Sequence, residues 1–118
     1  MDPVTEQQCS AGWLVRDGEV LASLETADGH RDRMRGLLGR DGFDGALLIR
    51  RCRSVHTIGM RFPIDVAYCA ADGEVVRVIA LRPGRVTLPV WRATQVIEVE
   101  AGAFGQWGLT VGDRLEFR

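Results

Sequence analysis

The segment HTIGMRFPIDV, residues 56–66, contains a histidine and an aspartate that could act together. His56 and Asp65 lie nine positions apart on either side of Pro63, so a sheet that bends there could bring them within hydrogen-bonding distance. A carboxylate that orients an imidazole makes a general base near neutral pH. One hypothesis is therefore a small, hydrolase-like enzyme with His56 and Asp65 as its acid–base pair. A nucleophile would come from a nearby hydroxyl or thiol: Ser54, Thr57 or Cys52.

The same residues also have a purely structural interpretation. Asp65 would cap a turn or pair with an arginine, and His56 would be a half-buried side chain whose hydrogen bonds are satisfied. The sequence has no G-x-S-x-G element, which would place a nucleophile on a sharp turn. The structural interpretation is therefore the first hypothesis for this pair, and catalysis is the alternative.

Arginines gather in the middle of the chain. Residues 31–61 hold eight arginines and only three acidic residues, although the net charge of the whole chain is −1. Arginine binds carboxylate and phosphate oxygens through paired hydrogen bonds, so a fold that gathers these side chains would create an anion-binding face. The residues expected to form it are Arg35, Arg53, His56, Thr57, Arg61 and Asp65. Alternatively, the arginines pair with acidic residues elsewhere and form a solvated surface of salt bridges.

Metal and cofactor sites have little support in the residue types. The two histidines, His30 and His56, lack metal-binding spacing, and the three cysteines, Cys9, Cys52 and Cys69, form no C-x-x-C pair. Cys69 lies in the apolar run VAYCAA, where a cysteine acts as a small buried hydrophobe. We therefore expect no metal and no cofactor.

Length and composition favour one soluble globular domain. A chain of 118 residues fits a single domain, and an apolar content of 46% is enough for a core. No apolar run reaches the ~20 residues of a membrane span, and the polar start MDPVTEQQCSAG does not resemble a signal peptide. These features predict a cytoplasmic protein with no membrane partner. The net charge of −1 argues against nucleic acid as a partner.

Turn signals and hydrophobic periodicity predict a mostly β fold. The pairs Asp17-Gly18 and Asp72-Gly73 each separate two strand-like runs, as in tight hairpins. Residues 74–81 are apolar on both faces, which is typical of a central strand. One main helix is expected near residues 29–38, where Met34, Leu37 and Leu38 form a stripe.

The second half of the chain predicts further strands and turns. RVTLPVW, residues 85–91, predicts an edge-like strand interrupted by Pro89. TQVIEVEA, residues 94–101, predicts a half-exposed strand with Glu98 outward, and GAFGQWGL a loop or a single helical turn. The resulting fold class is mostly β (α+β): a small antiparallel β-barrel or rolled sheet with one main helix. Residues 1–11 would be a loose tail and 12–118 a single β-rich domain.

Four motifs follow one another at fitting distances. They are RMRGLLGR (33–40), HTIGMRFPIDV (56–66), ATQVIEVEAG (93–102) and GLTVGD (108–113). Together they closely resemble the prokaryotic family catalogued as domain of unknown function number 192, over roughly residues 13 to 118. The resemblance implies a compact, mostly β single domain with one helix, and it implies no particular activity.

The favoured function is a non-catalytic binding or accessory module with an anion-friendly face. Its partner would be a small anionic ligand or another protein. A protein partner would require an exposed apolar patch of several hundred Å². The tryptophans Trp91 and Trp107 are the candidates for such a patch.

Overall fold

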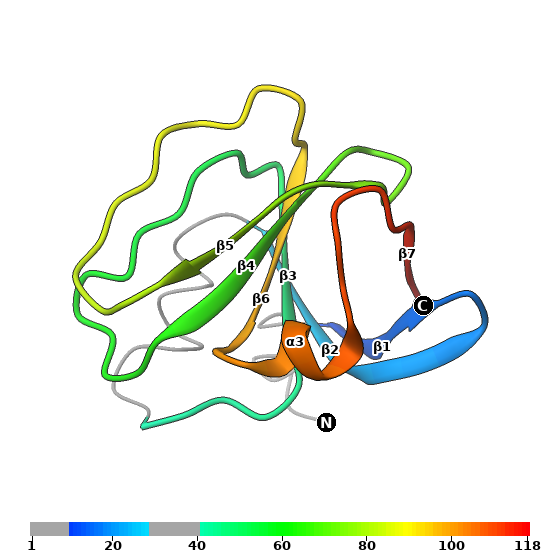
Figure 1. The fold of residues 1–118 in the computed structure, drawn as a ribbon, viewed down its shortest axis with the longest axis horizontal. Helices are drawn as coiled ribbons and strands as arrows, with labels where there is room; N and C mark the ends of the chain where they lie inside the picture. Colours follow the sequence, from blue (N-terminus) through cyan, green and yellow to red (C-terminus); the bar gives the residue numbers. More distant parts are fainter. Residues whose placement is uncertain (1–9, 29–40) are drawn as a thin grey trace, which may run out of the picture.

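A computed structural model describes residues 10–28 and 41–118 of the chain. Its strands are β1 Ser10–Arg16, β2 Glu19–Asp28, β3 Ala46–Arg50, β4 Ile64–Cys69, β5 Val75–Leu81, β6 Gln95–Glu100 and β7 Leu115–Phe117, and its helix is α3 Ala103–Trp107. The strands form one sheet in the order β5-β4-β6-β3-β2-β1-β7, which curls into a half-barrel (Figure 1). The predicted mostly β fold with a rolled sheet is confirmed.

One strand pair departs from the expected antiparallel pattern. β2 and β3 run parallel, whereas the other neighbours in the sheet are antiparallel. Parallel neighbours require a long crossover, and residues 29–45 are long enough to provide it. The main helix expected near residues 29–38 lies outside the described residues, as does Arg35.

Both predicted hairpins are confirmed. Arg16 pairs with Glu19 across the two-residue turn Asp17-Gly18, whose φ angles are 51° and 80°. The second hairpin joins β4 to β5 through Gly73, which has a φ of 90°. A Cβ atom at Gly73 would overlap the carbonyl oxygen of Leu115, so this turn requires glycine for space as well as for conformation.

The strand β5 lies at the edge of the sheet, so the expectation of a central, well-covered strand at residues 74–81 is wrong. Packing on both sides explains why both faces of β5 are apolar. Because the sheet curls, Val76 and Ile79 pack against one core cluster while Val78 packs against the other. At the start of β5, Glu74 forms an isolated bridge with Arg114, so the two edges of the sheet meet at one end.

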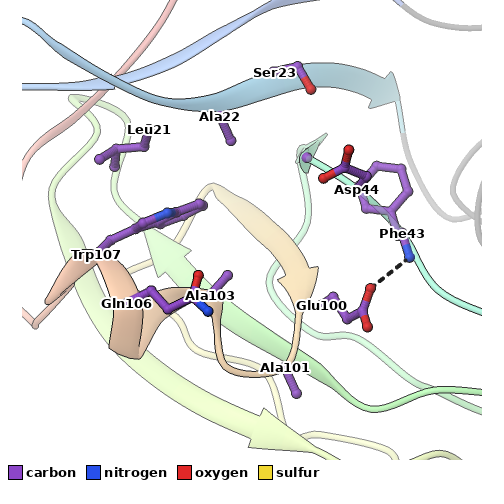
Figure 2. A pocket seen from close by; sticks show the side chains of 11 residues that line it. Leu21, Ala22, Ser23, Phe43, Asp44, Glu100, Ala101, Ala103, Gln106 and Trp107 are labelled. Atoms are coloured by element: carbon purple, nitrogen blue, oxygen red, sulfur yellow. Dashed lines mark hydrogen bonds between the residues drawn. The ribbon is translucent and has the colours of Figure 1, made fainter.

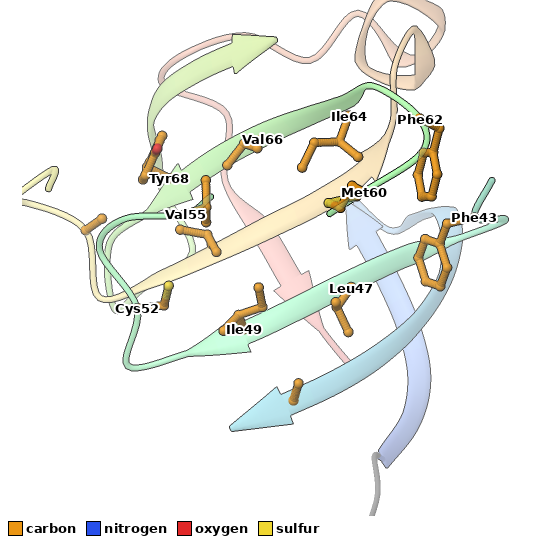
Figure 3. Packing of buried hydrophobic residues seen from close by; sticks show 13 residues of the cluster. Phe43, Leu47, Ile49, Cys52, Val55, Met60, Phe62, Ile64, Val66 and Tyr68 are labelled. Atoms are coloured by element: carbon orange, nitrogen blue, oxygen red, sulfur yellow. The ribbon is translucent and has the colours of Figure 1, made fainter. Parts of the chain in front are cut away.

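Two buried clusters cover the two faces of the sheet. The first lies between the sheet and the segment of residues 51–63, and includes Met60, Ile64 and Val66 (Figure 3). The second lies beneath α3 and β7, and includes the helix residue Phe104. Cys69 belongs to this second cluster and is fully buried, as expected for a small hydrophobe.

Coverage of both faces overturns the expectation that Glu98 points outward from a half-exposed strand. Glu98 is 0% exposed. Its strand, β6, lies between β4 and β3, and its neighbours Val96 and Ile97 each belong to one of the two clusters. A carboxylate on such a strand is buried whichever face it points toward.

Residues 85–91 do not form the expected edge-like strand. Only Val86 makes a β-bridge there, with His56, and the rest of the segment is irregular. Pro89 has no N–H to donate to a sheet, which limits pairing in this segment. By contrast, GAFGQWGL does contain the expected single helical turn, α3, which ends at Gly108 with a φ of 64°. Within residues 10–28 and 41–118, no helix has the length and apolar character needed to cross a membrane.

Candidate functional site

Residues 51–61 and 82–92 form two loops that run side by side, here called the paired loops (the adjacent green and yellow segments in Figure 1). Four backbone hydrogen bonds join them: Thr57 N to Arg85 O at 2.8 Å, Gly84 N to Thr57 O at 2.9 Å, Thr87 N to Val55 O at 3.0 Å, and Val90 N to Arg53 O at 2.9 Å. The His56–Val86 bridge lies within this ladder. The loops therefore form one structured surface.

Thr57 fastens the paired loops at one end. Its hydroxyl donates to the carbonyl oxygen of Arg82 at 2.6 Å and accepts the N–H of Arg85 at 2.9 Å. Its own carbonyl oxygen accepts the N–H of Gly84 at 2.9 Å. The side chain of Thr57 is 0% exposed. Its polar groups therefore position the arginines of the second loop, and do not themselves face solvent.

Thr87 fastens the middle of the paired loops to the sheet. Its hydroxyl donates to the carbonyl of Val55 at 3.1 Å, and accepts the Val55 N–H at 2.9 Å and the Tyr68 hydroxyl at 2.9 Å. Burial raises the pKa of Tyr68, so its phenol stays protonated and remains a donor at neutral pH. Beside this contact lies a small pocket of about 190 Å³. It is lined by Tyr68, Arg77, Ile79, Thr87, Leu88 and Val90.

His56 and Asp65 belong to different parts of the structure. His56 is half-buried within the paired loops, which pack over the first cluster, and its Nδ1 atom is shielded from solvent. Asp65 shares the opposite face of β4 with Ala67, and its Oδ2 accepts the N–H of Gly102 at 2.9 Å and of Phe104 at 3.4 Å. The Asp65 carboxylate therefore caps α3, and this geometry gives no support to an acid–base pair with His56.

The thiol of Cys52 also forms a hydrogen bond with the backbone of its own loop. Cys52 is 4% exposed, and its Sγ donates to the carbonyl of Ser54 at 3.0 Å. A buried thiol that is held in a hydrogen bond to the backbone is poorly placed to attack a substrate. Among the residues that the structure describes, no group of three or more His, Cys, Asp or Glu side chains could hold a metal ion.

The paired loops carry six arginines, and their sequences contain no acidic residue. All six are exposed: Arg51, Arg53, Arg61, Arg82, Arg85 and Arg92. Arg61 forms an ion pair with Asp41 at 3.5 Å, but its side chain is 62% exposed and that of Asp41 is 90% exposed. Such a pair is weak and leaves the charge of Arg61 accessible to a partner.

Arg53, His56, Thr57 and Arg61 were expected at an anion-binding face, and the structure places all four in the paired loops. The expectation missed the second loop, with Arg82, Arg85 and Arg92. The sequence contains a signal for the second loop, because residues 45–64 and 75–97 each contain four arginines and no acidic residue. Only the backbone hydrogen bonds of the folded chain show that the two stretches are neighbours.

Large apolar side chains are exposed between these arginines. Leu88 is 86% exposed and Trp91 is 76% exposed, and both lie on the second loop. Val86 and Ile58 are also exposed on the paired loops. Trp107 lies elsewhere, on α3 against the second cluster, so it does not belong to this apolar surface.

Two sequence comparisons match most of the chain. The sequence model of the family DUF192, described as "Uncharacterized ACR", matches residues 13–117. UPF0127 protein PF1050 of Pyrococcus furiosus is 33% identical over 109 residues, which cover 88% of this chain and 94% of that protein.

Two crystal structures are similar in fold. One is a protein of Sinorhizobium meliloti 1021 described as a proposed transcription regulator, with a TM-score of 0.75 and 20% identity over 92% of this chain and 93% of that one. The other is a protein of unknown function from Novosphingobium aromaticivorans DSM 12444, with a TM-score of 0.74 and 19% identity over 98% of this chain and 90% of that one. At these identities the likeness extends to the fold alone.

Proposed function

The chain belongs to the DUF192 family, and from its own surface we propose that it is a non-catalytic docking module that binds an acidic protein segment through the paired loops. The observation that carries the proposal is the set of six exposed arginines on two hydrogen-bonded loops without an acidic residue. Like charges held side by side repel one another and are neutralised best by an anionic partner.

The apolar side chains between the arginines favour a protein over a small anion. A free phosphate or carboxylate would contact arginines but would leave Leu88 and Trp91 in water. Interfaces between proteins use arginine and large apolar side chains together, since aromatic residues and arginine are enriched at the centres of such interfaces. The pocket of about 190 Å³ beside Leu88, with Arg77 at its wall, could receive one apolar side chain of the partner.

The surface is rigid enough to bind without large ordering costs. The hydroxyls of Thr57 and Thr87 hold the two loops to each other, and Tyr68 ties them to β4. Side chains on a preorganised backbone lose less entropy on binding than those on a mobile loop. We do not propose a hydrolase, because the Asp65 carboxylate caps α3 on the other face of the sheet.

The test uses short synthetic peptides and the backbone amide signals of the whole chain. An acidic peptide that contains aliphatic and aromatic residues is compared with the same peptide in which Gln and Asn replace Glu and Asp. We expect the acidic peptide alone to shift amide signals of residues 51–61 and 82–92, and its affinity to fall with added salt. Arg53→Glu and Arg85→Glu should each lower that affinity by about tenfold, a change of about 1.4 kcal/mol.

Arg118→Glu is the matched control. Arg118 is also an exposed arginine, but it lies outside the paired loops and pairs with Glu116. Its reversal should leave peptide binding unchanged. The proposal is wrong if neither loop variant weakens the peptide, or if vesicles rich in phosphatidylglycerol or single-stranded DNA bind to the paired loops while the acidic peptide does not.

A further inference from the structure

An open pocket of about 520 Å³ shares no residue with the paired loops. Strand β2, the residues that lead into β3, the end of β6 and the helix α3 surround it (Figure 2). Its lining includes Phe43, Asp44, Glu100, Gln106 and Trp107. This volume is within the range of small-molecule sites in proteins.

The walls of the pocket carry negative charge and an aromatic surface. The carboxylates of Asp44 and Glu100 lie on one side, and the indole of Trp107 lies across from them (Figure 2). The amide of Gln106 adds a further polar group to the wall. No described residue that lines the pocket is an arginine, a lysine or a histidine. The described walls of the pocket therefore favour a cation, and the indole offers a cation the negative face of its π system.

Glu100 is held in place by a backbone N–H on its own side of the pocket. Its Oε2 accepts the N–H of Phe43 at 3.1 Å. A Cβ at Gly42 would lie only 3.0 Å from that same oxygen, so glycine there permits the close approach. A carboxylate has about four acceptor positions, and one hydrogen bond leaves others for a ligand.

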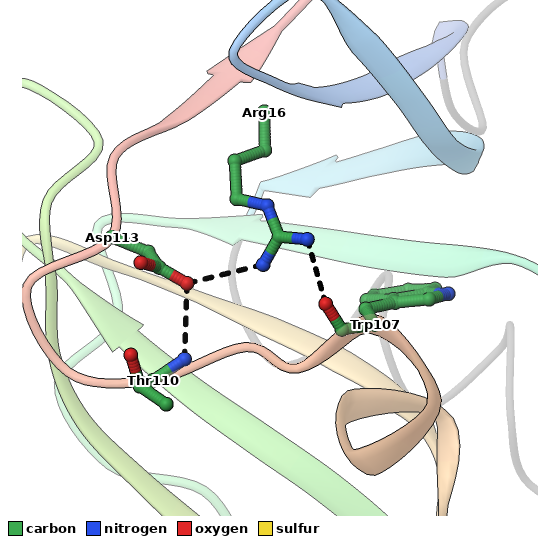
Figure 4. A network of polar contacts seen from close by, with 4 residues as sticks. All are labelled: Arg16, Trp107, Thr110 and Asp113. Carbon is green, nitrogen blue, oxygen red and sulfur yellow. Dashed lines mark hydrogen bonds and ion pairs between the residues drawn. The ribbon is translucent and has the colours of Figure 1, made fainter.

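Trp107 is fixed by contacts outside the pocket. Its carbonyl oxygen accepts a hydrogen bond of 2.6 Å from Arg16, whose guanidinium also pairs with Asp113 at 3.1 Å (Figure 4). Its ring packs against Phe104 with a centroid distance of 5.8 Å. The capping carboxylate of Asp65 holds the start of the same helix. Both walls of the pocket are thus set by the folded chain before any ligand arrives.

We propose that this pocket binds a small organic cation, a guanidinium or primary ammonium group on a short apolar stem. The cationic head would lie between Asp44 and Glu100, and the stem would pack along Trp107. A bare metal ion fits less well, because the described residues offer no cluster of three carboxylate, thiol or imidazole ligands. Since Asp44 and Glu100 are both exposed, each contributes modestly and the binding is weak.

The test uses n-butylguanidinium, with n-butylurea as its neutral counterpart of nearly the same shape. Binding is followed through the indole N–H signal of Trp107, assigned with Trp107→Phe, and through the amide signals of the intact chain. We expect the cation to shift the Trp107 indole and residues 43–45 and 100–107, and n-butylurea at the same concentration to leave them unchanged. A capped arginine tripeptide is tested beside it. If the tripeptide binds more tightly than n-butylguanidinium, the natural cation is an arginine side chain of a partner protein. If the two bind equally, the natural cation is a free small molecule.

Two conservative variants test the charges. Asp44→Asn and Glu100→Gln should each weaken n-butylguanidinium by about fivefold. Glutamine keeps an acceptor for the Phe43 N–H, and Asp44 is exposed with no structural hydrogen bond shown for its side chain, so neither change should unfold the chain. Glu116→Gln, an exposed carboxylate outside the pocket, is the matched control and should have no effect.

Three results would overturn the proposal. These are equal binding of n-butylurea, unchanged binding in both Asp44→Asn and Glu100→Gln, and binding of a neutral sugar such as methyl glucoside in place of the cation. None of them bears on the paired loops, because the two surfaces share no residue.

Discussion

The buried hydroxyl of Thr57 donates a hydrogen bond of 2.6 Å to the carbonyl oxygen of Arg82, which lies 25 residues further along the chain. The same hydroxyl accepts the N–H of Arg85 at 2.9 Å. One small side chain thus fixes the backbone of two exposed arginines on the second loop. The arginine surface depends on this contact, although Thr57 itself is hidden from any partner.

Thr57→Val should destabilise the chain without leaving a cavity. Valine has nearly the shape of threonine but leaves the Arg82 carbonyl and the Arg85 N–H without their partner. We expect the free energy of unfolding in urea to fall by about 1–3 kcal/mol. The control is Thr110→Val at an exposed position, which should change stability by less than about 0.5 kcal/mol. If the Thr57→Val chain is as stable as the parent, the hydrogen bonds of the Thr57 hydroxyl do not stabilise the fold.

Gly73→Ala and Gly84→Ala separate two reasons for glycine, its backbone conformation and the lack of space for a Cβ atom. Both residues have a positive φ, 90° and 80°, so alanine at either position costs about 1–2 kcal/mol of backbone strain. Only at Gly73 would the new Cβ meet another atom, the carbonyl oxygen of Leu115. We therefore expect a clearly larger fall in the unfolding free energy for Gly73→Ala. Equal losses in the two variants would contradict the tight contact between this hairpin and β7.

Asp65→Ala should loosen α3. The lost carboxylate accepts two backbone N–H groups, from Gly102 and Phe104, and hydrogen bonds to a charged acceptor contribute about 1.5–3 kcal/mol. Amide hydrogen exchange should accelerate at these two positions. Asp65→Asn keeps an acceptor oxygen and should lose less stability. If exchange at Gly102 and Phe104 is unchanged in Asp65→Ala, the capping role is wrong.

The thiol of Cys69 should make the fold sensitive to alkaline pH. Burial raises the pKa of Cys69 from 9.0 to about 12. Between these values the unfolded chain releases this proton while the folded chain keeps it, so stability is full below pH 9 and falls as pH rises toward 12. The slope from one such group is at most about 1.4 kcal/mol per pH unit.

Urea titrations of the parent chain and Cys69→Ala across this range measure the effect. Alanine lowers stability at neutral pH because it removes a buried sulfur. Above pH 9 the curve of the parent should fall more steeply than that of the variant, so the two should converge. Parallel curves would show that the Cys69 thiol ionises as readily in the fold as in water.

Features that depend on a few neighbouring residues could be predicted from the sequence. Asp17, Gly18 and Gly73 adopt the positive φ angles that their turns require, and the alternating runs beside both turns form strands. Glu98 shows the limit of this reasoning. Alternation along β6 correctly placed it on the face opposite Ile97, but its burial depends on what covers that face, and the covering segment comes from elsewhere in the chain.

The candidate site also has a part that could be predicted from the sequence and a part that could not. The sequence by itself determined that residues 50–61 hold arginines, a histidine and a threonine without acids, because composition within a short segment is independent of folding. Only the tertiary structure decided that Arg82, Arg85 and Arg92 join them, and that Asp65 turns to α3 on the other face. The physical reason is distance along the chain: a turn forms from a few adjacent dihedral angles, whereas the pairing of remote segments follows from the register and curl of the whole sheet.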